Sequence, residues 1–147
     1  MRSFRPVLLL AIVAVLVGGC SSAQERTYEL DVFNERDRPA TLWLLKDGRP
    51  FEETWRSPED YAWFQDGEHG GVVVGPGEVA QASRRGMFEP EARAILIVYD
   101  GDLTFNEMLA TPQGSSLRQD LVVRPGKTRI RLTERGAEQE QLGGPAE

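Results

Sequence analysis

The chain has one cysteine, Cys20, and this reactive thiol follows an apolar segment near the N-terminus. Arg2 and Arg5 precede an unbroken apolar run of 11 residues over positions 7–17, and two glycines separate that run from Cys20. Charged, then apolar, then small residues are the order found in secretory signal peptides. The run is too short to span a bilayer, which takes about 20 apolar residues. We therefore expect residues 1–19 to be a signal peptide.

The four residues Val17-Gly18-Gly19-Cys20 resemble the lipobox of bacterial lipoproteins, in which an aliphatic residue and small residues precede a cysteine. The resemblance implies a diacylglyceryl thioether on Cys20, cleavage before it, and usually a third acyl chain such as palmitate on the new amine. Two or more chains anchor a protein stably, since each buried methylene contributes about 0.8 kcal/mol. In such lipoproteins aspartate after the cysteine favours the inner membrane, so the resemblance, with Ser21 at that position, implies an outer membrane if the cell has one. The alternative is an ordinary signal peptide with a chance cysteine.

One histidine and a row of oxygen-bearing residues are the candidates for metal binding. His69 is the only histidine, and zinc or copper sites need several nitrogen or sulfur ligands, so we expect a solvated histidine and no metal cofactor. Asp100, Asp102, Thr104 and Asn106 occupy every second position, as in a calcium loop. The EF-hand pattern fails at its sixth and twelfth positions. We expect a strand end with helix capping, and a looser calcium site stays open.

No set of residues has the pattern of a catalytic site. Ser115 and Ser116 lack a Gly-x-Ser-x-Gly elbow, and the only histidine base is His69. Paired carboxylates such as Glu52-Glu53 serve glycosidases, but 23 acids make such pairs common here. The sequence therefore predicts that the protein is not an enzyme and has no catalytic residues, with a hydrolase the least favoured alternative.

Aromatic residues gather between positions 51 and 64. Five of the chain's 12 aromatic side chains lie there, flanked by acids. Exposed aromatics stack on sugar rings or anchor partner proteins, so the candidate contact residues are Trp55, Tyr61, Trp63 and Phe64. The alternative is that the cluster forms a buried lid over one end of the fold.

Charge excludes one class of partner. The chain carries 17 basic and 23 acidic side chains, and removal of residues 1–19 takes two arginines with it, leaving 15 and 23, a net charge of −8. An acidic domain lacks the basic surface that nucleic acids require. Anionic lipids repel it, so the acyl chains must anchor it. With Cys20 acylated no disulfide forms, and stability must come from a packed core.

Apolar residues alternate with acids over residues 28–32, the period of a half-buried strand. The most apolar stretch, residues 94–99, is expected to be a central strand buried on both faces. Further strands are expected over residues 40–45, 51–55, 72–74, 117–123 and 127–132.

Two segments share a pattern in which Pro-Gly follows a β-branched run. They are residues 72–78, VVVGPGE, and residues 121–127, LVVRPGK. Proline presets φ at the second position of a type II turn, and glycine accepts the positive φ at the third. We expect each segment to join two strands, with the second forming the last hairpin.

Two short helices are expected. Ser57 and Pro58 suit a helix start and predict a helix through residues 61–64. Thr104 and Glu107 have the spacing of a capping box.

The basic side chains Lys127, Arg129 and Arg131 alternate along one face of a strand. If that strand lies beside residues 28–32, they are expected to pair with acids such as Glu29 and Asp31.

About seven or eight short strands with Gly, Pro and Asp turns predict a mainly β fold with one or two short helices. The expected fold is an antiparallel β-sandwich, Ig-like or transthyretin-like, with a small barrel as second choice. The expected organisation is a signal peptide over residues 1–19, a lipidated tether over 20–26, the sandwich over 27–133 and a disordered polar tail over 134–147.

Residues 31–60 and 71–77 resemble small envelope lipoproteins of planctomycete-type bacteria, chiefly through NERDRP at 34–39 and WRSPED at 55–60. This resemblance implies no activity. The functional hypothesis is a lipid-anchored, non-enzymatic β-domain on the periplasmic or outer side of the envelope that binds or supports another envelope component. The alternative is a ligand-binding module for cell-wall glycan or calcium.

Overall fold

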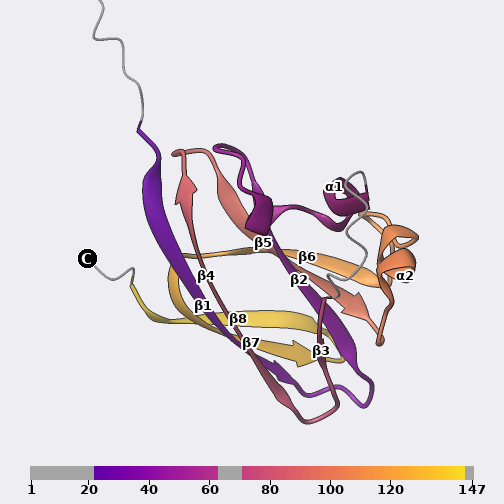
Figure 1. The fold of residues 1–147 in the computed structure, drawn as a ribbon. Helices are drawn as coiled ribbons and strands as arrows, with labels where there is room; N and C mark the ends of the chain where they lie inside the picture. Colours follow the sequence, from indigo (N-terminus) through magenta and orange to yellow (C-terminus); the bar gives the residue numbers. More distant parts are fainter. Residues whose placement is uncertain (1–21, 63–70, 145–147) are drawn as a thin grey trace, which may run out of the picture.

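The computed structural model describes residues 22–62 and 71–144, which form a β-sandwich with short helices on one side (Figure 1). Strand accounts for 54% and helix for 11% of the described residues, so the predicted mainly β sandwich is confirmed. The strands are β1 (Gln24–Asn34), β2 (Ala40–Asp47), β3 (Val72–Val74), β4 (Val79–Phe88), β5 (Arg93–Asp100), β6 (Arg118–Val123), β7 (Gly126–Thr133) and β8 (Gly136–Gly143). The helices are η1 (Glu53–Trp55), α1 (Pro58–Ala62) and α2 (Phe105–Leu109).

The strands form two separate four-stranded sheets, in the orders β4-β1-β7-β8 and β3-β2-β5-β6. All pairings are antiparallel except β1 with β7, which is parallel. Two stacked sheets rather than one closed sheet make the alternative of a small barrel wrong.

Both Pro-Gly segments join strands of different sheets. Residues 75–78 lead from β3 to β4, and residues 124–125 lead from β6 to β7. The first is a tight turn with Gly77 at φ 71° and the N–H of Glu78 donating to the carbonyl of Gly75 at 3.1 Å. The predicted last hairpin is therefore wrong, because β6 and β7 each pair with other strands. Proline and glycine determine the turn locally, whereas the pairing of the strands depends on contacts across the whole fold.

The main core lies between the sheets. On β1, Tyr28, Leu30 and Val32 are buried while Glu29 is exposed, as the alternation predicted. From the other sheet, β2 and β5 supply alternate apolar residues to the same cluster. Burying such side chains contributes about 1.5–3 kcal/mol each and holds the sheets together.

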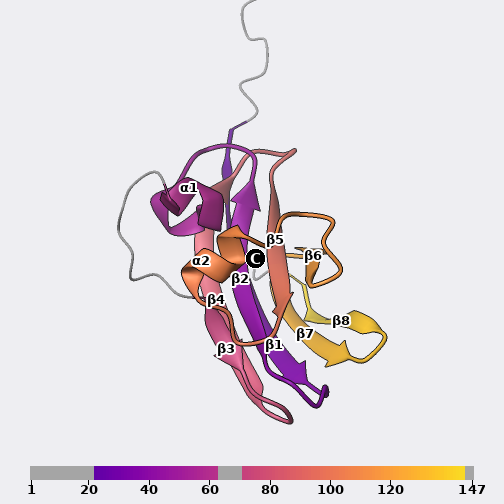
Figure 2. The ribbon, with the colours of Figure 1, turned by 90° about the vertical axis from the view of Figure 1, so that its right-hand side faces the viewer.

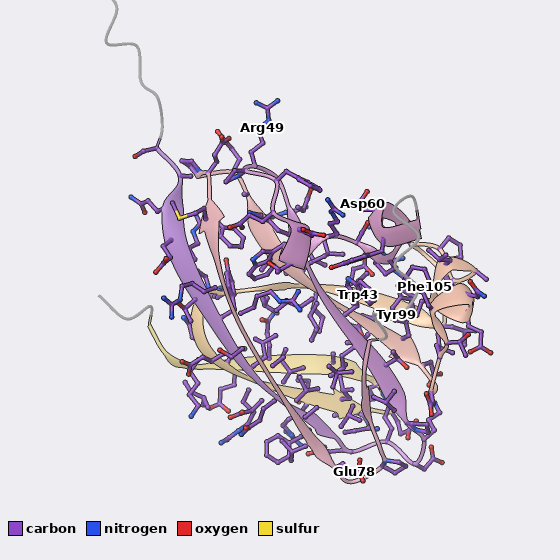
Figure 3. All side chains as sticks on the ribbon, in the orientation of Figure 1. Trp43, Arg49, Asp60, Glu78, Tyr99 and Phe105 are labelled. Atoms are coloured by element: carbon purple, nitrogen blue, oxygen red, sulfur yellow. The ribbon has the colours of Figure 1, made fainter. Side chains whose placement is uncertain are left out.

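β5 is buried on both faces, which confirms the prediction for residues 94–99. One face belongs to the main core, and the other carries Ile97 and Tyr99 into a second cluster with Trp43 and Met108. Figure 2 shows α1 and α2 side by side over this outer face, and Figure 3 places Trp43, Tyr99 and Phe105 close together there. The predicted capping box is present at the start of α2. Within the described residues, no helix is long and apolar enough to cross a membrane.

The basic stripe lies on β7, beside β1. Lys127 is the register partner of Glu29, and Arg129 that of Asp31. The two strands are therefore neighbours, as the pairing hypothesis required. The ion pairs of Arg129 and Arg131 are formed with other acids, however. Arg131 lies 2.8 Å from Glu35 and 3.5 Å from Glu138, and Arg129 lies 3.9 Å from Glu140.

Two element predictions are wrong. Residues 51–55 form no strand, since Glu53–Trp55 is a 3₁₀ turn that carries Trp55 into the core. The polar tail expected to be disordered contains β8, which pairs with β7, so the folded domain runs from Gln24 to Gly143. An edge strand needs few apolar residues, because its backbone bonds to one neighbour and its side chains face water.

Glutamines tie β8 to the opposite sheet. The side-chain amides of Gln139 and Gln141 each donate at 3.1 Å, to the carbonyls of Val122 and Pro125. The N–H of Ala137 donates to Gln119 at 3.1 Å. These polar contacts, together with Ala137, which packs against the main core, close one open side of the sandwich.

A candidate ligand-binding cleft

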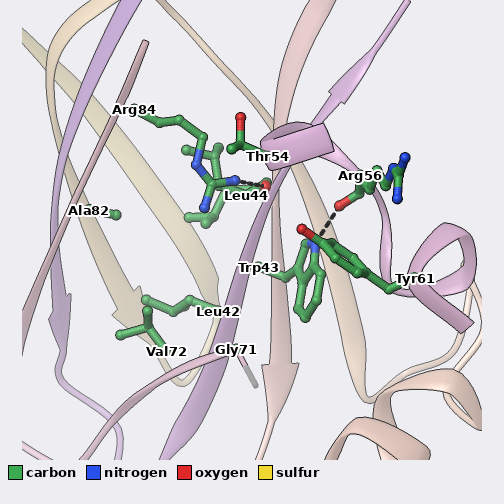
Figure 4. A pocket seen from close by; sticks show the side chains of 11 residues that line it. Leu42, Trp43, Leu44, Thr54, Arg56, Tyr61, Gly71, Val72, Ala82 and Arg84 are labelled. Carbon is green, nitrogen blue, oxygen red and sulfur yellow. Dashed lines mark hydrogen bonds between the residues drawn. The ribbon is translucent and has the colours of Figure 1, made fainter. Parts of the chain in front are cut away.

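A cleft of about 160 Å³ opens on the other side of the sandwich, between β2 and β4 (Figure 4). We call it the β2/β4 cleft. Its lining is formed by residues of both sheets and of the segment around η1 and α1, namely Leu42, Trp43, Leu44, Thr54, Arg56, Tyr61, Gly71, Val72, Ala82, Arg84 and Leu96.

The cleft exists because β3 is short. β3 has three residues and pairs with β2 only over Ala40–Leu42. The rest of β2, from Trp43 to Asp47, has no strand partner on that side among the described residues. Within the described residues, the edges of β2 and β4 therefore face each other and no strand lies between them.

Arg84 is the polar centre of the cleft. From β4 its Nη1 donates to the carbonyl of Leu44 on β2 at 2.7 Å, and its guanidinium lies 5.3 Å from the ring centroid of Trp55. Figure 4 shows the side chain reaching across the opening. Burial lowers the pKa of Arg84, although an arginine stays charged at neutral pH. Within residues 22–62 and 71–144, no carboxylate forms an ion pair with it.

Aromatic side chains form the wall opposite β4. The indole N–H of Trp43 donates to the carbonyl of Arg56 at 2.8 Å, and the ring of Tyr61 meets that of Trp43 edge-on at 5.6 Å. The hydroxyl of Tyr61 donates to the carbonyl of Glu53 at 3.1 Å. These bonds fix the wall, so the cleft is already formed in the free protein.

The structure places the predicted contact residues in different environments. Trp55 is wrong as a surface contact, because it is 2% exposed and packs against Tyr28 and Phe88. The alternative of a buried lid therefore holds for Trp55, whereas Phe51 of the same cluster is 66% exposed. Tyr61 is half-buried and lines the cleft, so its contact role stays a prediction.

The other predicted contacts, Trp63 and Phe64, lie outside the described residues, as do Cys20 and His69.

Two of the four proposed calcium residues, Asp100 and Thr104, make internal bonds. Asp100 accepts a bond from Arg38 at 2.5 Å, and Thr104 and Glu107 form the capping box of α2. Among the residues that the structure describes, no group of three or more His, Cys, Asp or Glu side chains could hold a metal ion.

Sequence reasoning missed Arg84. A signal was present, since Ala80, Ala82 and Arg84 share one face of β4 and the two alanines mark that face as the inward one. An arginine in phase with inward-facing small residues must find a polar partner or a ligand inside the fold. Comparisons of the chain with protein-family models, with curated proteins and with solved structures find no match.

Proposed function

We propose that the protein is a lipid-anchored, non-enzymatic domain of the bacterial envelope that binds another envelope component through the β2/β4 cleft. The observation that supports binding is the cleft itself, which combines a mostly apolar lining with a half-buried arginine, Arg84, that has no carboxylate partner among the described residues. Ligand sites typically combine apolar walls with a few placed polar groups.

The proposed anchor fits the start of the fold. Cys20 lies four positions before Gln24, where β1 begins. A tether this short holds the beginning of β1 near the membrane. Figure 3 places Arg49 at that end of the sandwich and Glu78 at the other.

The cleft lies within reach of a partner at the membrane. Arg84 is the register partner of Tyr28, the fifth residue of β1. At about 3.3 Å per residue, it lies about 13 Å along the strand from Gln24. The anchored domain therefore presents the cleft sideways, close to the bilayer surface.

Metabolic labelling tests the anchor. Cells expressing the chain are fed an alkyne-bearing palmitate analogue, and the expected result is a labelled protein that fractionates with membranes. The Cys20→Ser variant should lose the label and leave the membrane fraction. Equal labelling of both proteins would refute the assignment of Cys20.

Crosslinking in the native cells tests the binding role. Mass spectrometry of proteins captured with the anchored chain should identify a reproducible envelope partner. The matched comparison is Ala82→Phe, which fills the cleft with an aromatic side chain and leaves every charge in place. Capture that is unchanged by Ala82→Phe would exclude the cleft as the contact.

One observation supports a glycan ligand as a second candidate. Tyr61 lies half-buried at the cleft beside Trp43, and aromatic rings stack on sugars. Calorimetric titration with cell-wall glycan fragments distinguishes the two candidates. Heat of binding that disappears in Tyr61→Ala would favour glycan, and no heat would exclude it.

A further inference from the structure

One edge of β4 has no strand partner among the described residues. β4 pairs with β1 on one side only, so its other edge borders the β2/β4 cleft. Alternate residues of a strand direct their N–H and C=O groups to the same side. On β4, the backbone groups of Arg85 and Met87 point away from β1, because they bond to side chains from residues 46–55.

Those side chains protect only one end of the edge. The indole N–H of Trp55 donates to the carbonyl of Arg85 at 3.2 Å. Glu52 accepts a bond from the N–H of Met87 at 3.2 Å, and Lys46 donates to the carbonyl of Met87 at 2.7 Å. This half of the edge is closed to a further strand.

The other half is open. By the same alternation, Gln81 and Ser83 direct their N–H and C=O groups away from β1. Among residues 22–62 and 71–144 no backbone or side-chain group bonds to them, and both residues are exposed. An unpaired edge of this kind accepts an extended peptide as an additional strand.

Arg84, next to Ser83, supplies a charge for that peptide. Of the five guanidinium N–H donors, one bonds to Leu44. Among the described residues, two arginines and no acid line the cleft, although acids outnumber basic residues 23 to 17 in the chain. A terminal carboxylate offers two acceptor oxygens, and guanidinium binds such groups bidentately.

The size of the cleft limits what enters it. Its volume is about 160 Å³, and an apolar cavity of about 150 Å³ accepts a benzene molecule. Leu42, Leu44 and Leu96 contribute the apolar floor. One apolar side chain, such as that of leucine or phenylalanine, fits this space.

We propose that the β2/β4 cleft binds the C-terminal segment of a partner polypeptide. The segment adds a strand to β4 at Gln81 and Ser83, its last side chain fills the cleft, and its carboxylate pairs with Arg84. This inference rests on the proposed function and names the ligand class of the same site.

The test uses the mature lipidated chain in detergent micelles. The probes are hexapeptides immobilised by their N-termini, with three randomised C-terminal positions, each prepared with a free carboxylate and as a carboxamide. Peptides with an apolar last residue should bind at least about 10-fold more tightly as acids than as amides, a difference of about 1.4 kcal/mol. Equal binding of acids and amides, or no binding, overturns the proposal.

Two neighbouring arginines give a matched pair of variants. Arg84→Gln and Arg85→Gln remove the same charge, but Arg84 faces the cleft and the side chain of Arg85 is 69% exposed. Arg84→Gln should reduce the acid-to-amide ratio to about one, and Arg85→Gln should keep it. If Arg84→Gln fails to fold, Arg84→Lys keeps the charge and should keep part of the preference. Loss of the preference in Arg85→Gln, or its retention in Arg84→Gln, overturns the proposal.

Ser83→Pro tests the added strand. Proline removes the N–H that points away from β1, and edge strands tolerate it there. The β1–β4 pairing and the melting temperature should change little, while binding of acid and amide peptides falls together. Unchanged binding overturns the strand addition. A dimer of the chain that Ser83→Pro disperses would overturn it too, by making a second copy the occupant. A crosslinked cellular partner that persists in Arg84→Gln would refute this inference and leave the proposed function standing.

Discussion

Replacing Trp55 with alanine should lower the free energy of unfolding by about 4 kcal/mol. Trp55 is among the largest fully buried side chains, at 2% exposure. Its ring meets those of Tyr28 and Phe88 edge-on at 5.7 and 5.2 Å. Gly86 on β4 leaves room for it, since a Cβ there would overlap the indole nitrogen. The indole therefore joins the 3₁₀ turn η1 to both strands of one sheet edge.

The magnitude follows from area. A buried tryptophan removes about 150–250 Å² from water, which at about 25 cal/mol per Å² corresponds to about 4–6 kcal/mol. Alanine retains a small part of that burial. The bond from the indole N–H to the carbonyl of Arg85, at 3.2 Å, adds about 1 kcal/mol. The result agrees with the range of about 3–5 kcal/mol for such substitutions in cores.

Urea unfolding of the mature chain carrying Cys20→Ser measures the effect without acyl chains. Phe51→Ala is the matched control, because Phe51 belongs to the same aromatic cluster but is 66% exposed. Its cost should stay below about 0.5 kcal/mol. A cost below about 1 kcal/mol for Trp55→Ala, or equal costs for the two variants, would refute the assignment of Trp55 to the core.

Three further predictions concern single polar groups. Asn34→Ala should cost about 2–3 kcal/mol in urea unfolding, because the Asn34 amide is buried and donates to the carbonyl of Val74 at 3.0 Å. Tyr99→Phe should be neutral or stabilising by up to about 1 kcal/mol, since the buried hydroxyl has no hydrogen-bond partner among the described residues. The alkaline absorbance titration of this variant should lose a step, because burial raises the pKa of Tyr99 to about 12. The Arg131 guanidinium bonds to Glu35 and lowers the pKa of that carboxyl, so the pair stabilises the fold above the ordinary carboxyl pKa and its contribution is lost as pH falls through the lower folded value. Arg131→Gln should return the Glu35 pKa, measured by NMR titration, towards the ordinary value.

The features that sequence predicted correctly are those fixed by neighbouring residues. Alternation placed the inward face of β1, and continuous apolarity marked β5 as buried on both faces. The capping box of α2 and the turn before Glu78 depend on residues within four positions of each other. Patterns among neighbouring residues were therefore enough to predict these features.

The features that sequence missed depend on distant contacts. Residues 51–55 have strand composition, but the pocket formed by Tyr28, Phe88 and Gly86 draws Trp55 inward and imposes a turn. The polar tail becomes β8 because β7 offers it an edge. The pocket that receives Trp55 and the strand that pairs with β8 cannot be identified from the sequences of these two segments.

The same reason explains the errors at the site. An aromatic residue flanked by acids can lie in the core or on a contact surface. The local sequence is the same in both cases, because the fold determines whether the residue is buried. Trp55 was therefore misassigned, and Arg84 was overlooked because its distance from β2 cannot be read from β4 alone.

The two open sides of the sandwich satisfy unpaired carbonyls with different chemistry. On the β6/β8 side, Gln139 and Gln141 donate neutral amide groups, which satisfy a carbonyl without burying a charge. On the β2/β4 side, Arg84 donates one N–H to Leu44 and places a positive charge in a half-buried position, at a cost in desolvation that a glutamine would avoid. The contact of the guanidinium with the Trp55 ring, at 5.3 Å, accounts for part of that choice. The proposed carboxylate ligand would use the guanidinium donors that do not bond to Leu44. Arg84→Gln should therefore lose binding and cost less stability than Trp55→Ala.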